Sequence, residues 1–220
     1  MNIEYMTNKK VIFVGPSPCI RNKGLGEWID SFDIVVRTNG SVFFLDDPDF
    51  NRDYGSKYSV LFFNSQFQRH IQEIDMDKLK ARGLKHIYCK SFNSPLYDSI
   101  IDNGVPVEVI VQSPRVLEIR GALMGAIILD MIVSASPKEF HITGVDFYSN
   151  NKQKYYPGYL PESIIEEAAE MQRNRKTPQT VHDSDNNHRY IYELISSGKV
   201  KASSETINSL EQRLGHLKEN

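Results

Sequence analysis

The chain has 220 residues, of which 40% are hydrophobic and 25% charged, and it contains 13 Gly and 10 Pro. This composition excludes a disordered, collagen-like or low-complexity chain and predicts a soluble protein with a buried core. The formal net charge of -2 provides no overall positive field. A nucleic-acid site would therefore need a local basic patch.

The opening residues 1–10 lack the apolar core of a signal peptide. No run in the sequence approaches the roughly 18 apolar residues that span a bilayer. We therefore expect a cytoplasmic protein without a membrane span. Its two cysteines, Cys19 and Cys89, have no metal-ligand or redox spacing, and we expect both to be reduced thiols.

Short runs of β-branched and aromatic residues recur along the chain and predict strands. The predicted strands are residues 10–15, 34–37, 58–63, 86–89, 107–111 and 139–144. Segments with helical spacing are residues 65–82, 119–134, 161–173 and 188–197. This alternation predicts an α/β fold, a single Rossmann-like parallel sheet flanked by helices. We expect one domain over 1–220, with an α/β core at 9–150 and a helical C-terminal lid at 151–220.

Polar residues follow the predicted strands, where the carboxyl ends of a parallel sheet bind ligands. Asn and Ser dominate these positions, and an Asn amide suits nucleobase edges, ribose hydroxyls and phosphate oxygens. The alternative is that they are ordinary turn formers. The residues at these strand ends include Ser17, Asn39, Asn64, Asp146 and Tyr148.

The stretch 10–39, KVIFVGPSPCIRNKGLGEWIDSFDIVVRTN, resembles the large sialyl motif of family 29 sialyltransferases. That motif has a strand, Gly-Asn-Ser-Gly, a Gly-containing loop, Ile-Asp-Ser-His-Asp, a second strand and Arg-Met-Asn. The matching residues, in order and in spacing, are Gly15, Gly26, Ile29, Asp30, Ser31, Asp33, Arg37 and Asn39.

Three later segments extend the resemblance over most of residues 10–195. Residues 138–148 are similar to the strand and Gly-Ile-Asp-Phe-Tyr turn of bacterial family 42 sialyltransferases, and residues 60–65 to another strand and Asn turn of that family. Residues 181–185 resemble the late family 29 motif Val-His-Asp-Gly-Asp. The resemblance implies a sialyltransferase-like variant of the GT-A fold and an inverting, metal-independent transfer. The implied donor is a CMP-sugar, and the implied acceptor is a glycan hydroxyl.

The resemblance also implies the roles of individual residues. His182 corresponds to the catalytic base, and an unperturbed histidine pKa near 6.5 suits that task; the alternative is a loop histidine without function. Tyr155 and Tyr156 would bind the leaving phosphate with Tyr148, or else serve as packing anchors. The implied donor-binding residues are Gly15, Ser17, Asn39, Asn64, Gly125, Gly144, Asp146, Tyr148, Tyr155 and Tyr156.

The chain departs from the family pattern at several positions. Pro16 replaces the Asn that contacts the donor phosphate, Lys154 replaces the His before the tyrosine pair, and Asn187 replaces a Glu. The Ser-Gly of the family's small motif corresponds either to Arg120-Gly121 or to Met124-Gly125: the chemistry of a polar residue before Gly favours the first, and counting back from the Gly144 turn favours the second.

Two other motifs in the N-terminal half are weaker indications. The Asp-x-Asp pattern at 47–49 is a metal motif in other transferases, but the internal Pro48 favours an acidic turn. The pair Gly24 and Gly26 lacks the third Gly of a dinucleotide fingerprint.

Two alternatives keep nucleotide recognition but change the activity. The first is a viral or phage glycosyltransferase that adds a sugar to DNA bases, with a local basic rim. That rim would consist of Lys152, Lys154, Arg173, Arg175 and Lys176. The second is a nucleotide-binding module that senses its ligand without catalysis.

Overall fold

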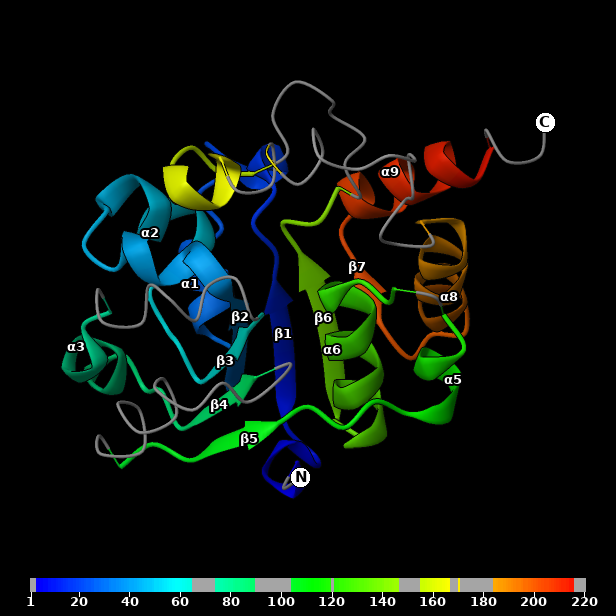
Figure 1. The fold of residues 1–220 in the computed structure, drawn as a ribbon, viewed down its shortest axis with the longest axis horizontal. Helices are drawn as coiled ribbons and strands as arrows, with labels where there is room; N and C mark the ends of the chain where they lie inside the picture. Colours follow the sequence, from blue (N-terminus) through cyan, green and yellow to red (C-terminus); the bar gives the residue numbers. More distant parts are fainter. Residues whose placement is uncertain are drawn as a thin grey trace.

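The structure, a computed structural model, describes residues 3–64, 74–89, 104–119, 121–146, 155–166, 170 and 184–215. In this part of the chain, seven parallel strands form one sheet in the order β5-β4-β3-β2-β1-β6-β7 (Figure 1). The strands are β1 (Lys10–Val14), β2 (Ile34–Thr38), β3 (Val60–Phe63), β4 (His86–Cys89), β5 (Val107–Val109), β6 (Glu139–Thr143) and β7 (Lys201–Ala202). The predicted fold class and all six predicted strands are confirmed, and β7 is an additional strand.

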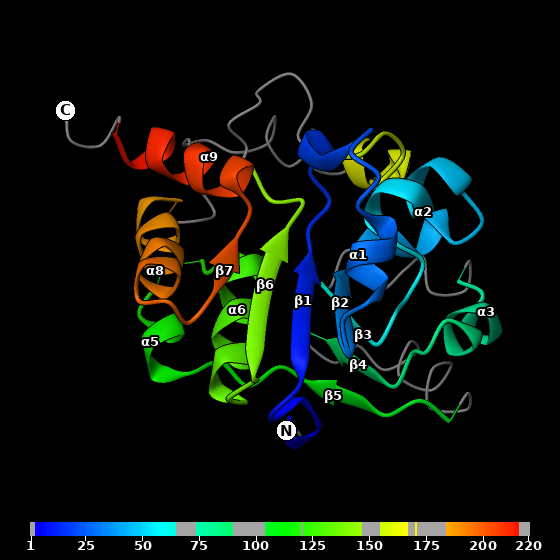
Figure 2. The ribbon, with the colours of Figure 1, turned by 180° about the vertical axis from the view of Figure 1, so that it is seen from behind.

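Helices cover both faces of the sheet, as Figures 1 and 2 show from opposite sides. The labelled helices are α1 (Gly26–Asp30), α2 (Pro48–Tyr54), α3 (Met76–Ala81), α5 (Pro114–Leu117), α6 (Met124–Ser134), α8 (Ser184–Ser196) and α9 (Ser204–Gly215). Three short 3-10 helices are Glu4–Met6, Pro18–Ile20 and Asn39–Phe44. A further helical turn lies at 162–166.

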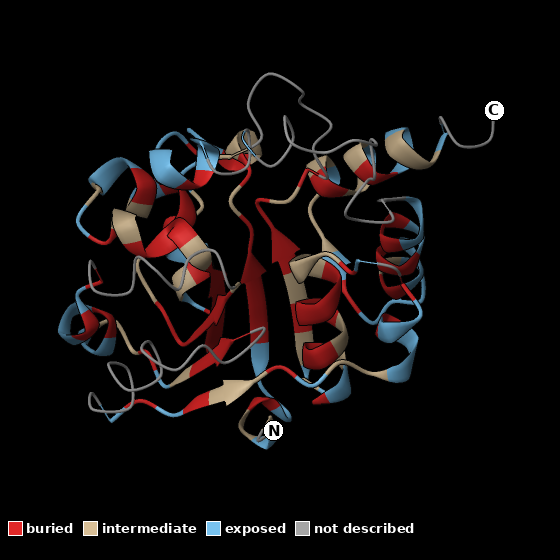
Figure 3. Ribbon diagram, in the orientation of Figure 1, coloured by how far each residue is buried: buried red, intermediate tan, exposed pale blue. Residues whose placement is uncertain are grey.

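Strand side chains alternate between two cores because successive residues of a strand point to opposite faces. Val11 and Phe13 pack with the apolar residues of α6, α8 and α9. Ile12 and Val14 pack with those of α1, α2 and α3. Both helical layers turn their buried residues toward the sheet (Figure 3). The sheet is therefore buried on both faces, and its carboxyl edge is where the polar loops meet.

Three helix boundaries differ from the sequence-based expectation. Of the helix expected at 65–82, residues 65–73 lie outside the described residues, and α3 begins at Met76 because Asp75 caps it by accepting from Lys78 N. The helix expected from 119 begins at Met124, because Gly121 adopts a left-handed φ of 64° that a helix cannot contain. The helix expected from 188 begins at Ser184, so the late motif leads directly into α8. The short helices α1, α2 and α5 were not predicted, and α9 lies within the expected helical C-terminal region.

The C-terminal region is helical as expected, and it is also built into the body of the fold. β7 extends the sheet beyond β6, with His141 opposite Lys201. Ile191 and Leu194 of α8 belong to the same core cluster as α6. Among the described C-terminal segments, α9 and the segment 155–166 lie along the carboxyl edge (Figure 1), whereas α8 packs with α6 in a layer that flanks the sheet.

Two smaller expectations concern membranes and cysteines. In the described ranges, every helix is too short or too polar to cross a bilayer. Cys19 is half-buried and Cys89 is buried, and both are free cysteines.

Candidate active site

The strand order changes direction between β1 and β6. From β1 the chain builds β2 to β5 on one side, and β6 and β7 then extend the sheet on the other side. In open α/β sheets, ligands bind outside the carboxyl ends of the strands at such a switch point. The candidate site is therefore at the ends of β1 and β6, where the sequence places Gly15 and Gly144.

The turns after β1 and β6 touch through their backbones. Gly15 N donates to Thr143 O at 2.8 Å, and Ser17 N donates to Gly144 O at 2.8 Å. A Cβ on Gly15 would lie 2.4 Å from Gly144 O, and a Cβ on Gly144 would lie 2.5 Å from Gly15 O. Gly144 also has a left-handed φ of 66°. Both positions therefore require glycine, because the two turns pack backbone against backbone.

Ser17 is almost fully buried and holds the loop after β1. Its Oγ accepts from Cys19 N at 3.2 Å and so caps the 3-10 helix Pro18–Ile20. Its carbonyl accepts a 2.7 Å hydrogen bond from the hydroxyl of Tyr54 on α2. Burial raises the pKa of Tyr54, so this hydroxyl remains protonated. The Ser17 hydroxyl therefore stabilises the loop after β1, and the Ser17 backbone N–H binds the β6 turn.

Two predicted donor-binding asparagines lie together at the next strands. Asn39 follows β2 with a left-handed φ of 42°, and Asn64 follows β3. The side-chain oxygen of Asn39 accepts from Asn64 N at 2.9 Å. This bond fixes the Asn39 side chain at the carboxyl edge of the sheet.

The tyrosine segment 155–160 is anchored to the loop after β1 and to the end of β2. Tyr156 N donates to Pro16 O at 2.7 Å. The Tyr156 ring packs edge-on against Phe44, Phe50 and Tyr54, and its hydroxyl contacts an Asp47 carboxylate oxygen at 3.3 Å. Thus Tyr156 has the contacts of a packing anchor. Pro16, which replaces the family's Asn, provides the carbonyl that holds it.

Tyr159 is a further member of this segment that the sequence did not single out. Its hydroxyl donates to Thr38 O at 2.7 Å and lies 2.8 Å from Thr38 Oγ1. Tyr155 stacks on the Tyr159 ring with centroids 5.6 Å apart and is only half-buried. Tyr155 is therefore less buried than Tyr156 and Tyr159.

The β6 turn is closed on its other side by α9. Thr206 Oγ1 donates to Val145 O at 2.9 Å, and Asp146 beside it is 5% exposed. Lys23, in the loop after β1, forms an ion pair with Glu205 of α9. The Lys23 ammonium holds the pKa of Glu205 down to about 2. Contacts from α2, from the tyrosine segment 155–160 and from α9 thus surround the Gly15 and Gly144 turns.

The remaining site residues are only partly described. Gly125 is the second residue of α6, and no atom lies within 4 Å of a Cβ built on it. His182, Tyr148 and Lys154 lie outside the described residues. Arg120, of the small-motif alternative, also lies outside them. The same is true of the four members of the proposed basic rim besides Lys154, which are Lys152, Arg173, Arg175 and Lys176.

The Asp-x-Asp segment forms a helix cap. Asp47 accepts from Asp49 N at 2.9 Å and from Phe50 N at 3.0 Å, with Pro48 in the first turn of α2. This is the arrangement that an N-cap aspartate and an N1 proline favour. Over the described ranges, no three His, Cys, Asp or Glu side chains are grouped as metal ligands.

His188 is the one other histidine close in sequence to His182, and it is 2% exposed in α8. Burial, together with the charge of Arg213, lowers the pKa of His188 to about 4. We therefore predict that stability falls as the pH decreases from about 6.5 to 4, because the unfolded chain gains the proton first. The expected loss between pH 7 and pH 5 is about 2 kcal/mol.

Urea unfolding at both pH values measures this loss, and His188→Gln should remove most of it. A loss of the same size in His188→Gln would contradict the assignment. His141→Gln is the matched control, since His141 is half-buried and bound to Glu139 at 2.8 Å.

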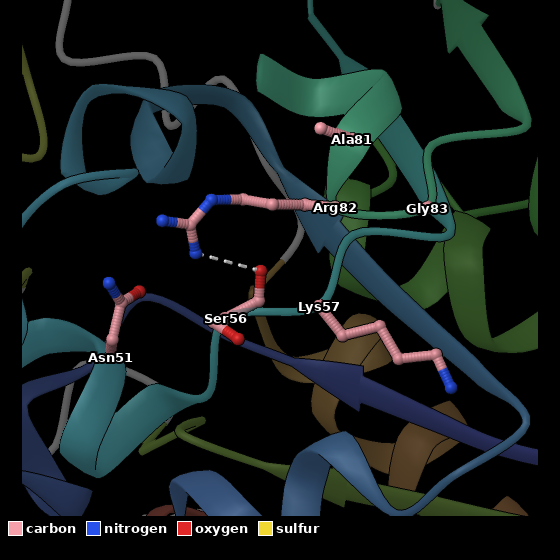
Figure 4. Close-up of a pocket in the computed structure, with 6 residues that line it drawn as sticks. All are labelled: Asn51, Ser56, Lys57, Ala81, Arg82 and Gly83. Atoms are coloured by element: carbon pink, nitrogen blue, oxygen red, sulfur yellow. Dashed lines mark hydrogen bonds between the residues drawn. The ribbon is translucent and has the colours of Figure 1, made fainter.

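A pocket with a volume of about 730 Å³ lies at the opposite, amino edge of the sheet (Figure 4). It is lined by Asn51, Ser56, Lys57, Ala81, Arg82 and Gly83. Arg82 donates to Ser56 O at 3.2 Å and also to Leu45 O, and Asn51 Nδ2 donates to Leu45 O at 3.0 Å. The Lys57 side chain points away from Arg82 (Figure 4) and binds Phe32 O. The polar side chains of Asn51, Lys57 and Arg82 bind backbone carbonyls of neighbouring segments, so we assign them a structural role.

Comparisons with known proteins find a similar family and similar folds. The family model "Glycosyltransferase family 29 (sialyltransferase)" matches residues 5–91, which extend just past β4. A mammalian sialyltransferase structure is similar with 17% sequence identity and a TM-score of 0.52, over 89% of this chain and 68% of that chain. The sialyltransferase CstII from Campylobacter jejuni, in complex with cytidine-5'-monophosphate, gives 16% identity and a TM-score of 0.48, over 89% and 79%.

A search of curated protein sequences finds no match to the chain. The family match and the mammalian structure confirm the predicted resemblance and the sialyltransferase fold.

Proposed function

We propose that the chain is an inverting, metal-independent glycosyltransferase that transfers a sialic acid or a related acidic sugar from a CMP-sugar donor to a glycan hydroxyl. The observation that carries this proposal is the reciprocal contact of Gly15 and Gly144 at the switch point. This contact joins the loops after β1 and β6 at the switch point, which is where open α/β sheets bind their ligands. The family 29 match over residues 5–91 includes the first of these loops.

The donor would lie along the carboxyl edge, from the Asn39 and Asn64 pair to the β6 turn. The nine described members of the implied donor-binding set all belong to loops or a helix start at this edge. Asn39 has its side-chain oxygen on Asn64 N, which leaves its amide hydrogens to bind a ribose or base. Tyr155 is the more exposed tyrosine of the pair and would meet the leaving phosphate. Tyr156, by contrast, would hold the segment in place through its ring and backbone.

In the proposed reaction, His182 removes the proton of the acceptor hydroxyl while that oxygen attacks the anomeric carbon. The bond from this carbon to the phosphate oxygen breaks, and CMP leaves with the electron pair. Attack opposite the leaving group inverts the configuration. Hydrogen-bond donors at the edge would stabilise the charge that develops on the phosphate.

The acceptor class is proposed from the shared fold. A mammalian sialyltransferase with the same fold, at a TM-score of 0.51 and 17% identity, has been solved with a Gal-beta-1-3GalNAc derivative. A glycan with a free hydroxyl is therefore the first acceptor to test. DNA is the alternative, and retention on DNA at low salt would favour it.

The first experiment is a thermal-shift panel of cytidine and uridine mono- and diphosphates, with and without magnesium. We expect CMP to stabilise the protein most, by about 2.7 kcal/mol at 100 times its Kd, with the same shift in the presence of a chelator. A larger shift with a uridine diphosphate plus magnesium would contradict the proposed donor. CMP binding without hydrolysis or transfer of a CMP-sugar would indicate a sensing module.

We predict that His182→Ala lowers the transfer rate by at least about 100-fold, the low end of the effect of a general base. The CMP Kd should remain within about twofold, because the proton transfer contributes to the reaction and not to nucleotide binding. Transfer is measured with a CMP-sugar and an acceptor glycan, and binding by calorimetry. His216→Ala is the histidine control, and a wild-type rate in His182→Ala would refute the role of the base.

A further inference from the structure

Asn187 connects α8 to the start of α6. Its side-chain Oδ1 accepts a 2.8 Å hydrogen bond from Leu123 N, and the residue is 0% exposed. Leu123 is the N-cap residue of α6, and its own side chain makes no capping bond. A side chain from a neighbouring helix therefore satisfies the N–H of the N-cap residue of α6, as the Glu of a capping box does within one helix.

The contact is one of a series along one face of α8. Tyr190 OH donates to the Asp130 carboxylate of α6. Glu193 pairs with Arg115 of α5, whose guanidinium lies 4.9 Å from the centroid of the Tyr190 ring. Positions 187, 190 and 193 recur at every third residue, so they lie on one side of the helix. These contacts fix the register of α8 against α6.

α6 runs against the direction of β6, so its first turn lies at the carboxyl edge of the sheet. Met124 and Val145, from α6 and from the β6 turn, pack on the same core cluster. The N-terminal turn of α6 includes Gly125, where the surface is open. A shift of this turn would therefore move a part of the proposed donor site.

We infer that Asn187 is a positioning residue that holds the first turn of α6, with Gly125, in register with α8 at the carboxyl edge of the sheet. This inference rests on the proposed function. Asn187 acts through Leu123 and Gly125 and is not itself a catalytic residue. The family 29 Glu that it replaces is one methylene longer, and the shorter Asn side chain fits the buried position beside Leu123 N.

The test compares Asn187→Leu with Tyr190→Phe. Asn187→Leu keeps the size of the side chain but removes the acceptor for Leu123 N. Tyr190→Phe removes a bond of the same helix pair without touching the α6 cap. We expect the KM for the donor to rise about tenfold in Asn187→Leu, comparable to the effect of one lost buried hydrogen bond, with kcat changed less than threefold. Tyr190→Phe should leave the KM within about twofold.

Two further measurements separate positioning from a general loss of structure. Amide hydrogen exchange at Leu123 and Gly125 should accelerate in Asn187→Leu and not in Tyr190→Phe. Asn187→Asp restores an acceptor and should recover most of the donor KM. Equal KM values for the donor in Asn187→Leu and wild type would overturn this inference but would leave the proposed function standing. A wild-type protein that neither binds CMP nor transfers sugar would instead refute the proposed function, and the inference with it.

Discussion

Replacing Arg37 by Met is expected to reduce the free energy of unfolding by about 3–5 kcal/mol. Arg37 is 0% exposed in β2. Its Nε donates to Lys57 O at 2.8 Å, and its Nη2 donates to Tyr54 O at 2.7 Å and Gly55 O at 2.8 Å. Methionine would fill most of the space, but it would leave these buried carbonyls without a donor.

The cation is placed where the surrounding dipoles favour it. The carbonyls that it binds are at the C-terminal end of α2, where the helix dipole is negative. Its guanidinium also lies 4.5 Å from the centroid of the Tyr58 ring, a favourable cation–π arrangement. Burial lowers the pKa of Arg37, yet an arginine remains charged because its ordinary pKa lies so far above neutrality.

The effect should extend to the candidate site through α2. Tyr54, whose carbonyl binds Arg37, donates its hydroxyl to Ser17 O at the opposite edge of the sheet. Equilibrium urea unfolding gives the stability change. Arg82→Met is the matched control, because Arg82 also binds two carbonyls but is half-buried, so that water can replace it at a cost of about 1 kcal/mol. An equal loss in both variants would show that burial of Arg37 has no special effect.

The sequence predicted the strands better than the helices, for a physical reason. Buried parallel strands consist of short, continuous apolar runs such as 10–14 and 60–63, which are visible without knowledge of the partner strands. The helices α1, α2 and α5 are too short for a periodic apolar pattern. The Asp47-Pro48 pair is a helix-start signal that could have identified α2. β7 has two residues and depends on pairing with β6, which no local pattern encodes.

The candidate site was predicted in outline but not in its supporting contacts. Strand ends and the family pattern located Gly15, Asn39 and Gly144 correctly at one edge. The contacts of Tyr159 with Thr38 and of Thr206 with Val145 join segments far apart in the chain, so no sequence spacing reveals them. The sequence shows that Pro16 replaces a family Asn, but it does not show what the Pro16 backbone contacts. The structure uses the Pro16 carbonyl to hold Tyr156 N.

Gly144→Ala and Gly15→Ala are each expected to destabilise the protein by about 3–4 kcal/mol and to abolish CMP binding. For Gly144→Ala, a left-handed φ costs about 1–2 kcal/mol in a non-glycine residue. The new Cβ would also lie 2.5 Å from Gly15 O, and such overpacking costs about 1–3 kcal/mol. For Gly15→Ala the collision with Gly144 O at 2.4 Å and with the Val145 side chain at 2.5 Å dominates.

Gly24→Ala separates the two contributions, because Gly24 has nearly the same φ, 62°, and no atom lies within 4 Å of its Cβ position. We expect Gly24→Ala to lose only the backbone contribution, about 1–2 kcal/mol, and to retain CMP binding. Urea unfolding and calorimetry with CMP measure both effects. The difference between Gly144→Ala and Gly24→Ala then gives the energy of the contact between the two turns. If the two variants were equally stable and bound CMP equally well, the close approach of the β1 and β6 turns could not be what forms the nucleotide site.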